Sequence, residues 1–219
     1  MDDAAKTSMR ITIPTALTLF RIALLPVMVV VFYAGFRGAN IAAAAIFIAA
    51  ALTDWLDGWV ARRYDMGSAF GAFLDPVADK LMVAVALFLI VQGHPTPWMA
   101  FWAAVIVGRE IAVSALREWM AELGQRAKVR VALIGKIKTI AQMVALLCLL
   151  YAIQPGQSAP GAGTWMGSFV FHVGDWTLAI AAILTLWSGL QYLHAAWPSL
   201  REDEKAALQQ NPKKVETNS

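Results

Sequence analysis

The residues of this sequence that could carry chemistry are four aspartates inside or beside apolar stretches, Asp54, Asp57, Asp75 and Asp79. An ionised carboxylate in such a setting costs several kcal/mol unless a partner offsets its charge. Carboxylate oxygens suit hard cations such as Mg²⁺ or Mn²⁺, and four carboxylates could hold two such ions. The aspartates therefore predict a metal-dependent site.

The spacing around the first two aspartates places them on one helical face together with small residues. In an α-helix of about 3.6 residues per turn, residues three, four, seven and eight positions apart share a face. From residue 54 onward this face consists of Asp54, Asp57, Gly58, Ala61 and Arg62. Small side chains between charged ones leave room for a ligand to approach the backbone. An antiparallel helix that carries Asp75 and Asp79 would complete a cluster of four carboxylates.

Simpler interpretations stay open for several of these residues taken singly. Asp75 precedes Pro76 and could only cap the start of a helix. Asp79 could form a local ion pair with Lys80, and Arg62 could be one of the basic residues that anchor a helix at the membrane surface. These interpretations do not account for the spacing of the whole set, so we favour a functional cluster.

The composition shows what kind of chain must position these residues. Hydrophobic residues make up 59% of the sequence and charged residues 15%, and the mean hydropathy is +0.58. These values are typical of a polytopic membrane protein and not of a soluble domain. The net charge of +3 is too small to indicate nucleic-acid binding. Cys148 is the only cysteine, which excludes an intramolecular disulfide.

The apolar segments predict an all-α protein with about six transmembrane helices, because a span needs about 20 apolar residues. We predict these helices at residues 15–35, 40–62, 74–92, 97–119, 131–152 and 175–197. Together they form one membrane domain, residues 15–198. Residues 1–14 are expected to be a cytoplasmic or interfacial segment, and residues 199–219 a disordered cytoplasmic tail.

The basic residues predict the orientation of the chain in the membrane. One set of connections between the predicted spans carries nearly all of the Lys and Arg, whereas the other set carries only Arg37. Basic residues are retained on the cytoplasmic side, so both termini and the aspartates are expected there. The connection 153–174 holds no Lys or Arg and is rich in turn formers, and Asp175 after it is expected to cap the last helix.

The aspartates belong to a longer pattern, Asp57-Gly58-x-x-Ala61-Arg62, then eight residues, then Gly71-x-x-x-Asp75-x-x-x-Asp79, with Asp54 upstream. This pattern resembles the signature of the CDP-alcohol phosphatidyltransferases at every position. The resemblance implies a six-helix membrane enzyme in which an incoming hydroxyl displaces CMP from a CDP-linked lipid, with two divalent cations, Mg²⁺ or Mn²⁺, as cofactors.

The resemblance also implies roles for individual residues. The metal ligands would be Asp54, Asp57, Asp75 and Asp79. Asp79 would in addition be the catalytic general base that takes the proton of the attacking hydroxyl. The contacts to the CDP-lipid would be made by Gly58, Ala61, Arg62 and Gly71. No Cys, His or Ser lies in the pattern, which favours direct displacement over a covalent intermediate.

Basic residues elsewhere in the apolar segments predict that the acceptor carries a phosphate. The candidate acceptor-binding residues are Arg109, Lys136, Thr139, Arg117, Thr18 and Arg21. Lys136 and Lys138 point about 200° apart on a helix, so both cannot line one pocket, and we favour Lys136. Lys138, Arg21 and Arg117 could instead only reach lipid headgroups, and Glu110 could pair with Arg117.

Longer segments resemble the bacterial members of this family that use glycerol 3-phosphate. Among them are Ile13-Pro-Thr-Ala-Leu-Thr-Leu-Phe-Arg21 and Gly135-Lys-Ile-Lys-Thr-Ile-Ala-Gln-Met-Val144, and the likeness spans about residues 11–195. Many relatives carry Asn where Thr15 stands, so Thr15 is assigned no role. The resemblance implies that CDP-diacylglycerol and glycerol 3-phosphate give phosphatidylglycerophosphate and CMP, at a site facing the cytoplasm in a bacterial inner membrane.

Two alternatives stay open. A sibling enzyme would use another acceptor, such as inositol phosphate, serine or phosphatidylglycerol. A divalent-cation transporter would also carry intramembrane carboxylates, although near the midplane and on interrupted helices. The expected partners are the two substrates and membrane lipids, with no nucleic acid. A homodimer is also considered, because Ser188 and Gly189 could form a helix-packing face.

Overall fold

The chain is all helical where its structure is described, which confirms the predicted fold class. The computed structural model describes residues 12–64, 68–122, 133–155 and 164–210, without the side chains at 69, 133–136, 195 and 198–210. These residues form six helices and no strand. The helices are α1 (Ile13–Tyr33), α2 (Ala39–Tyr64), α3 (Ala69–Gly93), α4 (Pro97–Glu122), α5 (Leu133–Ala152) and α6 (Trp165–Gln210).

The helix bounds follow the predicted spans closely except at α6. This helix begins at Trp165 and ends at Gln210, whereas we expected a span over 175–197 followed by a disordered tail from 199. Asp175 is therefore inside the helix and does not cap it. The glycines at 167 and 174 suggest turns in the sequence, but the residues between them are largely apolar. In an apolar environment such residues form a helix because the backbone must satisfy its own hydrogen bonds.

Four of the helices are long and apolar enough to cross a membrane. They are α1, α2, residues Pro97–Ala121 of α4 and residues Trp165–His194 of α6. In α5 the residues Ile137–Ala152 form a shorter apolar stretch, which contains Lys138. In α3 the apolar stretch is interrupted by Asp75, Asp79 and Lys80. The membrane character is thus confirmed, while six complete crossings and the orientation of the termini stay predictions.

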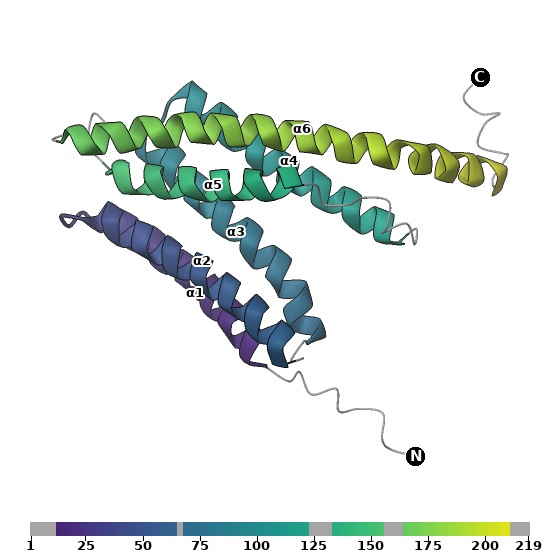
Figure 1. Cartoon of the computed structure of the whole chain (residues 1–219), viewed down its shortest axis with the longest axis horizontal. Helices are drawn as coiled ribbons and strands as arrows, with labels where there is room; N and C mark the ends of the chain where they lie inside the picture. Colours follow the sequence, from purple (N-terminus) through teal and green to yellow (C-terminus); the bar gives the residue numbers. More distant parts are fainter. Residues whose placement is uncertain (1–11, 65–67, 123–132, 156–163, 211–219) are drawn as a thin grey trace, which may run out of the picture.

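The helices pack as two pairs that contact each other through α3 and directly through α2 and α5. Helix α1 lies against α2, α5 lies against α6, and α3 runs between the pairs and contacts α1, α4 and α5 (Figure 1). Helix α4 also contacts α6. The start of α1, the end of α2 and the start of α3 lie together at one end of the molecule (Figure 1). This topology brings the predicted site residues of all three helices to the same end.

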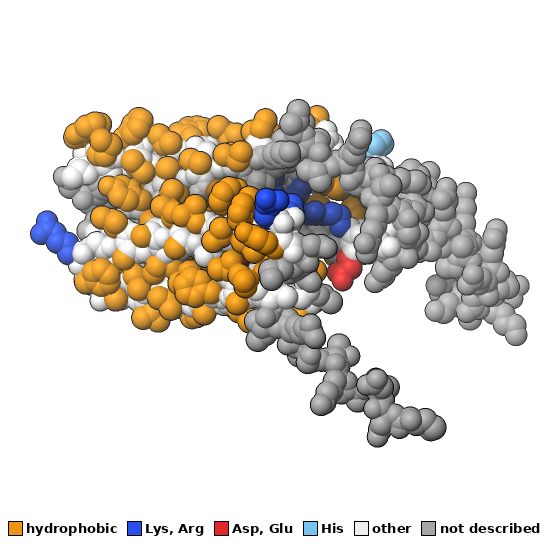
Figure 2. Space-filling model, turned by 60° about the horizontal axis from the view of Figure 1, so that its bottom comes forward, with side chains coloured by type: hydrophobic (Ala, Val, Ile, Leu, Met, Phe, Trp, Pro, Cys, Tyr) orange, Lys and Arg blue, Asp and Glu red, His pale blue; other side chains and the backbone are white. Residues whose placement is uncertain are grey.

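The core and the outer surface are both apolar. Met28 and Phe32 of α1, Phe47 of α2 and Leu149 of α5 are among the fully buried core residues. Large apolar side chains such as Phe73 are exposed on the outside. Figure 2 shows this apolar surface, with Lys, Arg, Asp and Glu side chains gathered beside a hollow at its edge. An apolar exterior of this extent suits contact with lipid.

Candidate active site

Arg21 is the centre of the predicted carboxylate cluster. Its Nη1 lies 2.9 Å from Asp54 Oδ1 and 3.1 Å from Asp79 Oδ1, and its Nη2 donates to Asp57 Oδ2. Its side chain is fully buried, and its Nε has no hydrogen-bond partner among the residues that the structure describes. The arginine was predicted to bind the acceptor phosphate, but the structure places it among the aspartates of α2 and α3. One guanidinium thus joins three of the four carboxylates.

The carboxylates differ in their access to solvent. The Asp57 side chain is only 6% exposed, whereas those of Asp54 and Asp79 are 42% and 52% exposed. Asp57 is therefore the inner member of the cluster, and the other two lie at its open rim. Asp79 at the rim is accessible to a substrate, as a general base must be.

Asp75 is bound from α1 by Thr18. Thr18 Oγ1 donates to Asp75 Oδ1 over 2.7 Å and also lies 3.1 Å from the Pro14 carbonyl oxygen. Asp75 does not cap α3, because the helix begins at Ala69 and Ser68 is its N-cap. The alternative that Asp75 is only a helix cap is therefore wrong. Thr18, like Arg21, belongs to the carboxylate cluster and not to the neighbourhood of Arg109.

The chemistry of this cluster fits divalent cations. All of its acidic ligands are carboxylates, and Arg21 is the only cation within ion-pair distance of them among the described residues. The cluster is therefore rich in negative charge. In the arrangement described here no three acidic or histidine side chains converge on one ion-sized position. Arg21 instead binds the carboxylates that an ion would use, so metal binding requires these side chains to rearrange.

The small residues of the signature lie beside this cluster. A Cβ atom added to Gly58 would lie 3.3 Å from Arg62 Nη1, so the Arg62 side chain folds back over Gly58 on the same helix. Ala61 is half-buried and Arg62 is exposed. An exposed guanidinium next to the carboxylates is available to a phosphate.

Gly71 packs against the start of α1. A Cβ atom there would lie 2.9 Å from Thr15 Oγ1 and 3.0 Å from Ser68 Oγ. Gly71 N donates to Ser68 Oγ over 2.9 Å, and Ser68 Oγ is 2.7 Å from Thr15 Oγ1. Gly71 was predicted to contact the CDP-lipid, but in the structure its small size lets α3 approach α1.

Thr15 is the residue that the sequence analysis passed over. It is buried and hydrogen-bonds with Ser68 and, over 2.9 Å, with Thr12. A signal for it exists in the sequence, because Thr15, Thr18 and Arg21 follow one another at intervals of three residues. That spacing puts them on one side of α1, toward α2 and α3.

A second polar cluster lies between α4, α5 and α6. Arg109 Nε donates to the Thr185 carbonyl oxygen over 3.0 Å, and its Nη2 donates to Ser188 Oγ over 2.6 Å. The Tyr192 ring centre lies 5.9 Å from Arg109 Cζ and 5.7 Å from Arg117 Cζ. These distances are within the range of cation–π contacts. Two predicted acceptor ligands, Arg109 and Arg117, are thus brought to one aromatic ring.

The two lysines of α5 were predicted to point in different directions, and the structure describes the side chain of Lys138. Lys138 is buried, and its Nζ lies 2.8 Å from Glu110 Oε1. Glu110 therefore pairs with Lys138 and not with Arg117. Thr139 is exposed. The side chain of Lys136, our favoured acceptor ligand on this helix, lies outside the described residues.

The two clusters lie on neighbouring helices. Lys80, which follows Asp79, and Glu110, which follows Arg109, line the same cavity of about 190 Å³ between α3 and α4. Residues next in sequence to both clusters thus meet across one helix interface.

Known proteins resemble this chain over most of its length. The CDP-diacylglycerol–glycerol-3-phosphate 3-phosphatidyltransferase of Salmonella choleraesuis (strain SC-B67) is 50% identical over 188 residues, which cover 86% of this chain and 96% of the relative. The protein of the same name from Yersinia pestis (strain Pestoides F) is 49% identical over 194 residues, covering 89% of this chain and 100% of the relative. The family model for CDP-alcohol phosphatidyltransferase matches residues 11–189. This chain therefore belongs to the CDP-alcohol phosphatidyltransferase family.

Proposed function

We propose that this protein transfers the phosphatidyl group from CDP-diacylglycerol to glycerol 3-phosphate, giving phosphatidylglycerophosphate and CMP. The observation that carries the proposal is the likeness to relatives that are named for this reaction. They align with this chain over nearly their full length and are identical to it at about half of the aligned positions. The complete aspartate signature, gathered around Arg21 at one end of the helices, supports it. A transporter would carry its carboxylates near the midplane of the membrane. The carboxylates here lie at one end of the helices, so a transporter is not favoured.

The aspartates are the part of the site that would receive the donor. Asp54, Asp57, Asp75 and Asp79 would hold two divalent cations, Mg²⁺ or Mn²⁺, whose charge would offset that of the CDP diphosphate. The exposed guanidinium of Arg62 would bind a phosphate of the donor, beside the small residues Gly58 and Ala61. Apolar surfaces around the site would keep the acyl chains in the membrane.

The acceptor would be bound through its phosphate by Arg109 and Arg117. The free primary hydroxyl of glycerol 3-phosphate attacks the phosphatidyl phosphorus, and the bond from that phosphorus to the CMP oxygen breaks. The hydroxyl proton passes to Asp79, whose side chain is half exposed at the rim of the cluster. CMP leaves with the electron pair of the broken bond.

The proposed location is the cytoplasmic face of a bacterial inner membrane. In the sequence, nearly all of the basic residues between the predicted spans belong to the connections on the side where the aspartates are expected, and membrane proteins retain such residues in the cytoplasm. CDP-diacylglycerol would reach the site laterally from the bilayer, and glycerol 3-phosphate from the aqueous side.

Purified protein in detergent tests the proposed reaction. CMP release would be measured with CDP-diacylglycerol and, in separate reactions, glycerol 3-phosphate, inositol phosphate, serine and phosphatidylglycerol. We expect rapid release only with glycerol 3-phosphate. Rapid transfer to one of the other acceptors with none to glycerol 3-phosphate would overturn the acceptor assignment, and cation flux in liposomes without any lipid product would support a transporter.

A further inference from the structure

The part of α6 that faces α4 forms a seat for Arg109. Arg109 Nε and Nη2 donate to Thr185 O and Ser188 Oγ, and Ser188 Oγ is itself 3.1 Å from Thr185 O. Both α6 residues are buried. One turn of α6 thus fixes two of the three nitrogens of the guanidinium. Ser188 and Gly189, which we considered as a dimer face, are occupied by an arginine of the same chain.

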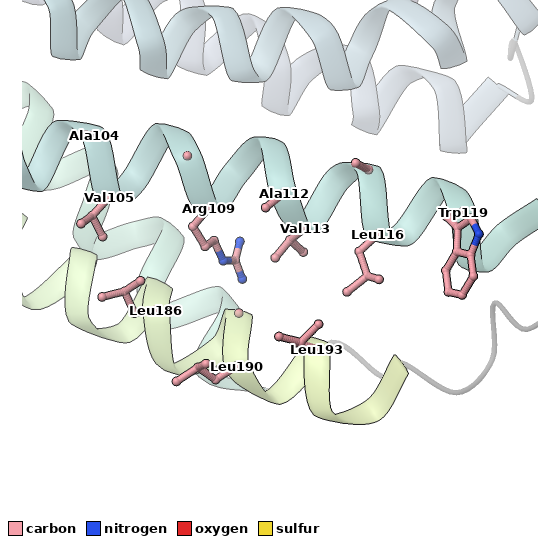
Figure 3. A pocket seen from close by; sticks show the side chains of 13 residues that line it. Ala104, Val105, Arg109, Ala112, Val113, Leu116, Trp119, Leu186, Leu190 and Leu193 are labelled. Atoms are coloured by element: carbon pink, nitrogen blue, oxygen red, sulfur yellow. The ribbon is translucent and has the colours of Figure 1, made fainter. Parts of the chain in front are cut away.

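Gly189 makes this seat possible. A Cβ atom at this position would lie 3.2 Å from Arg109 Cγ and 3.5 Å from its Nε. A side chain there would therefore press on the arginine at Cγ. Figure 3 shows Arg109 reaching from α4 toward α6, in the wall of an apolar groove of about 750 Å³. The groove is lined by apolar side chains around this one charged residue.

Tyr192 contributes the next contact along α6. Its ring is within 6 Å of the guanidinium carbons of both Arg109 and Arg117, as given above. Two like charges that share one ring repel each other, and the negative face of an aromatic ring offsets part of that repulsion. Neither arginine has a carboxylate within ion-pair distance among the described residues. The pair therefore presents unpaired positive charge.

The remaining hydrogen-bonding capacity of Arg109 points to an anion. Its Nη1 makes no hydrogen bond to any residue that the structure describes. A guanidinium held on one edge with donors left over on the other is suited to a phosphate.

We propose that Ser188, Gly189 and Tyr192 of α6 are positioning residues that aim Arg109 and Arg117 at the phosphate of the acceptor. This inference rests on the proposed function. It makes α6 a determinant of acceptor affinity, although the helix contributes no residue to the aspartate signature. The three residues act through the two arginines and are not assigned contact with the reacting atoms.

Two substitutions at Tyr192 distinguish the contribution of its ring from the contribution of its hydroxyl. Tyr192→Leu removes the cation–π contacts, and we expect the KM for glycerol 3-phosphate to rise about tenfold, with the KM for CDP-diacylglycerol changed less than about twofold. Tyr192→Phe keeps the ring and should stay within about threefold of the wild type in both. Ser188→Ala and Gly189→Ala should each raise the KM for glycerol 3-phosphate about threefold to tenfold, because the arginine loses its anchor or is pushed aside.

Ile183→Ala is the matched control, because Ile183 is exposed on the same stretch of α6 and is not part of the groove wall. The proposal is overturned if Tyr192→Leu and Gly189→Ala keep a normal KM for glycerol 3-phosphate. It is also overturned if both substrates' KM values rise together, or if Tyr192→Phe is as impaired as Tyr192→Leu. If Tyr192→Leu does not fold, the KM values of Gly189→Ala and Ser188→Ala for the two substrates test the proposal in the same way. If the wild-type protein does not use glycerol 3-phosphate as an acceptor, the proposed function itself is refuted.

Discussion

Replacing Arg21 by glutamine should make the stability of the protein depend strongly on divalent cations. Arg21 is fully buried and binds three carboxylates, of which Asp57 is also buried. Removing one partner of a buried ion pair costs about 3–5 kcal/mol. The contacts to Asp54 and Asp79 add little to this, because those side chains are about half exposed and are screened by solvent. We therefore expect a loss of about 3 kcal/mol, nearly all of it from Asp57.

The assay is thermal unfolding in detergent, with and without millimolar Mg²⁺ or Mn²⁺. For a chain of this size about 1 kcal/mol corresponds to roughly 2–4 °C, so Arg21→Gln should lower the apparent melting temperature by about 6–12 °C in chelator. Cations that bind the freed carboxylates should restore part of this loss, by mass action on the folded state. The wild type should gain less from the same cations, because Arg21 already offsets part of the negative charge.

Two further variants sharpen this test. Arg21→Gln combined with Asp57→Asn removes both buried charges and should be more stable in chelator than Arg21→Gln alone. Arg37→Gln is the matched control, because Arg37 is exposed in the connection between α1 and α2, and it should melt like the wild type. The reasoning is refuted if Arg21→Gln loses the same stability with and without cations, or if the second substitution restores nothing.

Three other changes test separate parts of the site. Asp79→Asn should lower kcat for CMP release by at least about a hundredfold, the scale of a general-base contribution, and near-normal turnover would remove Asp79 from that role. Chelation of divalent cations should abolish CMP release, and added Mg²⁺ or Mn²⁺ should restore it, whereas full turnover in chelator would contradict the metal assignment. Gly71→Ala should destabilise the protein by about 1–3 kcal/mol, because its Cβ would lie 2.9 Å from Thr15 Oγ1. An unchanged melting temperature would show that α1 shifts to accommodate the methyl group at little cost.

The local features of this protein were predictable from its sequence. The apolar segments predicted the six helices, because helical hydrogen bonds are the only local way to satisfy a backbone in lipid. Helical phase placed Asp54 and Asp57 on one face, and the structure joins them through Arg21. Phase also predicted different directions for Lys136 and Lys138, and the Lys138 side chain turns to Glu110. Each of these depends on the periodicity of one helix.

The partners of the buried charges were not predictable in the same way. Arg21 was assigned to the acceptor phosphate because the sequence gives its charge and depth but not the helix that it faces. That choice depends on how α1 packs against α2 and α3. The surroundings of Thr15 and Gly71 were not predicted for the same reason, since their contact with Ser68 exists only where α3 meets α1. The start of α6 was missed because glycines suggest turns even where apolar neighbours favour a helix.

The arrangement divides the site between two groups of helices. The aspartates and Arg21 are contributed by α1, α2 and α3, whereas Arg109 and Arg117 of α4 are oriented by α6. A change in α6 could therefore alter the affinity for the acceptor and leave the carboxylates untouched. This separation gives a physical reason why one aspartate signature can serve enzymes with different acceptors, because the chemistry of displacement and the recognition of the incoming alcohol depend on different helix contacts. In the proposed arrangement, Thr185 and Ser188 hold one edge of the half-buried Arg109 guanidinium and leave its other edge available to the phosphate of the acceptor.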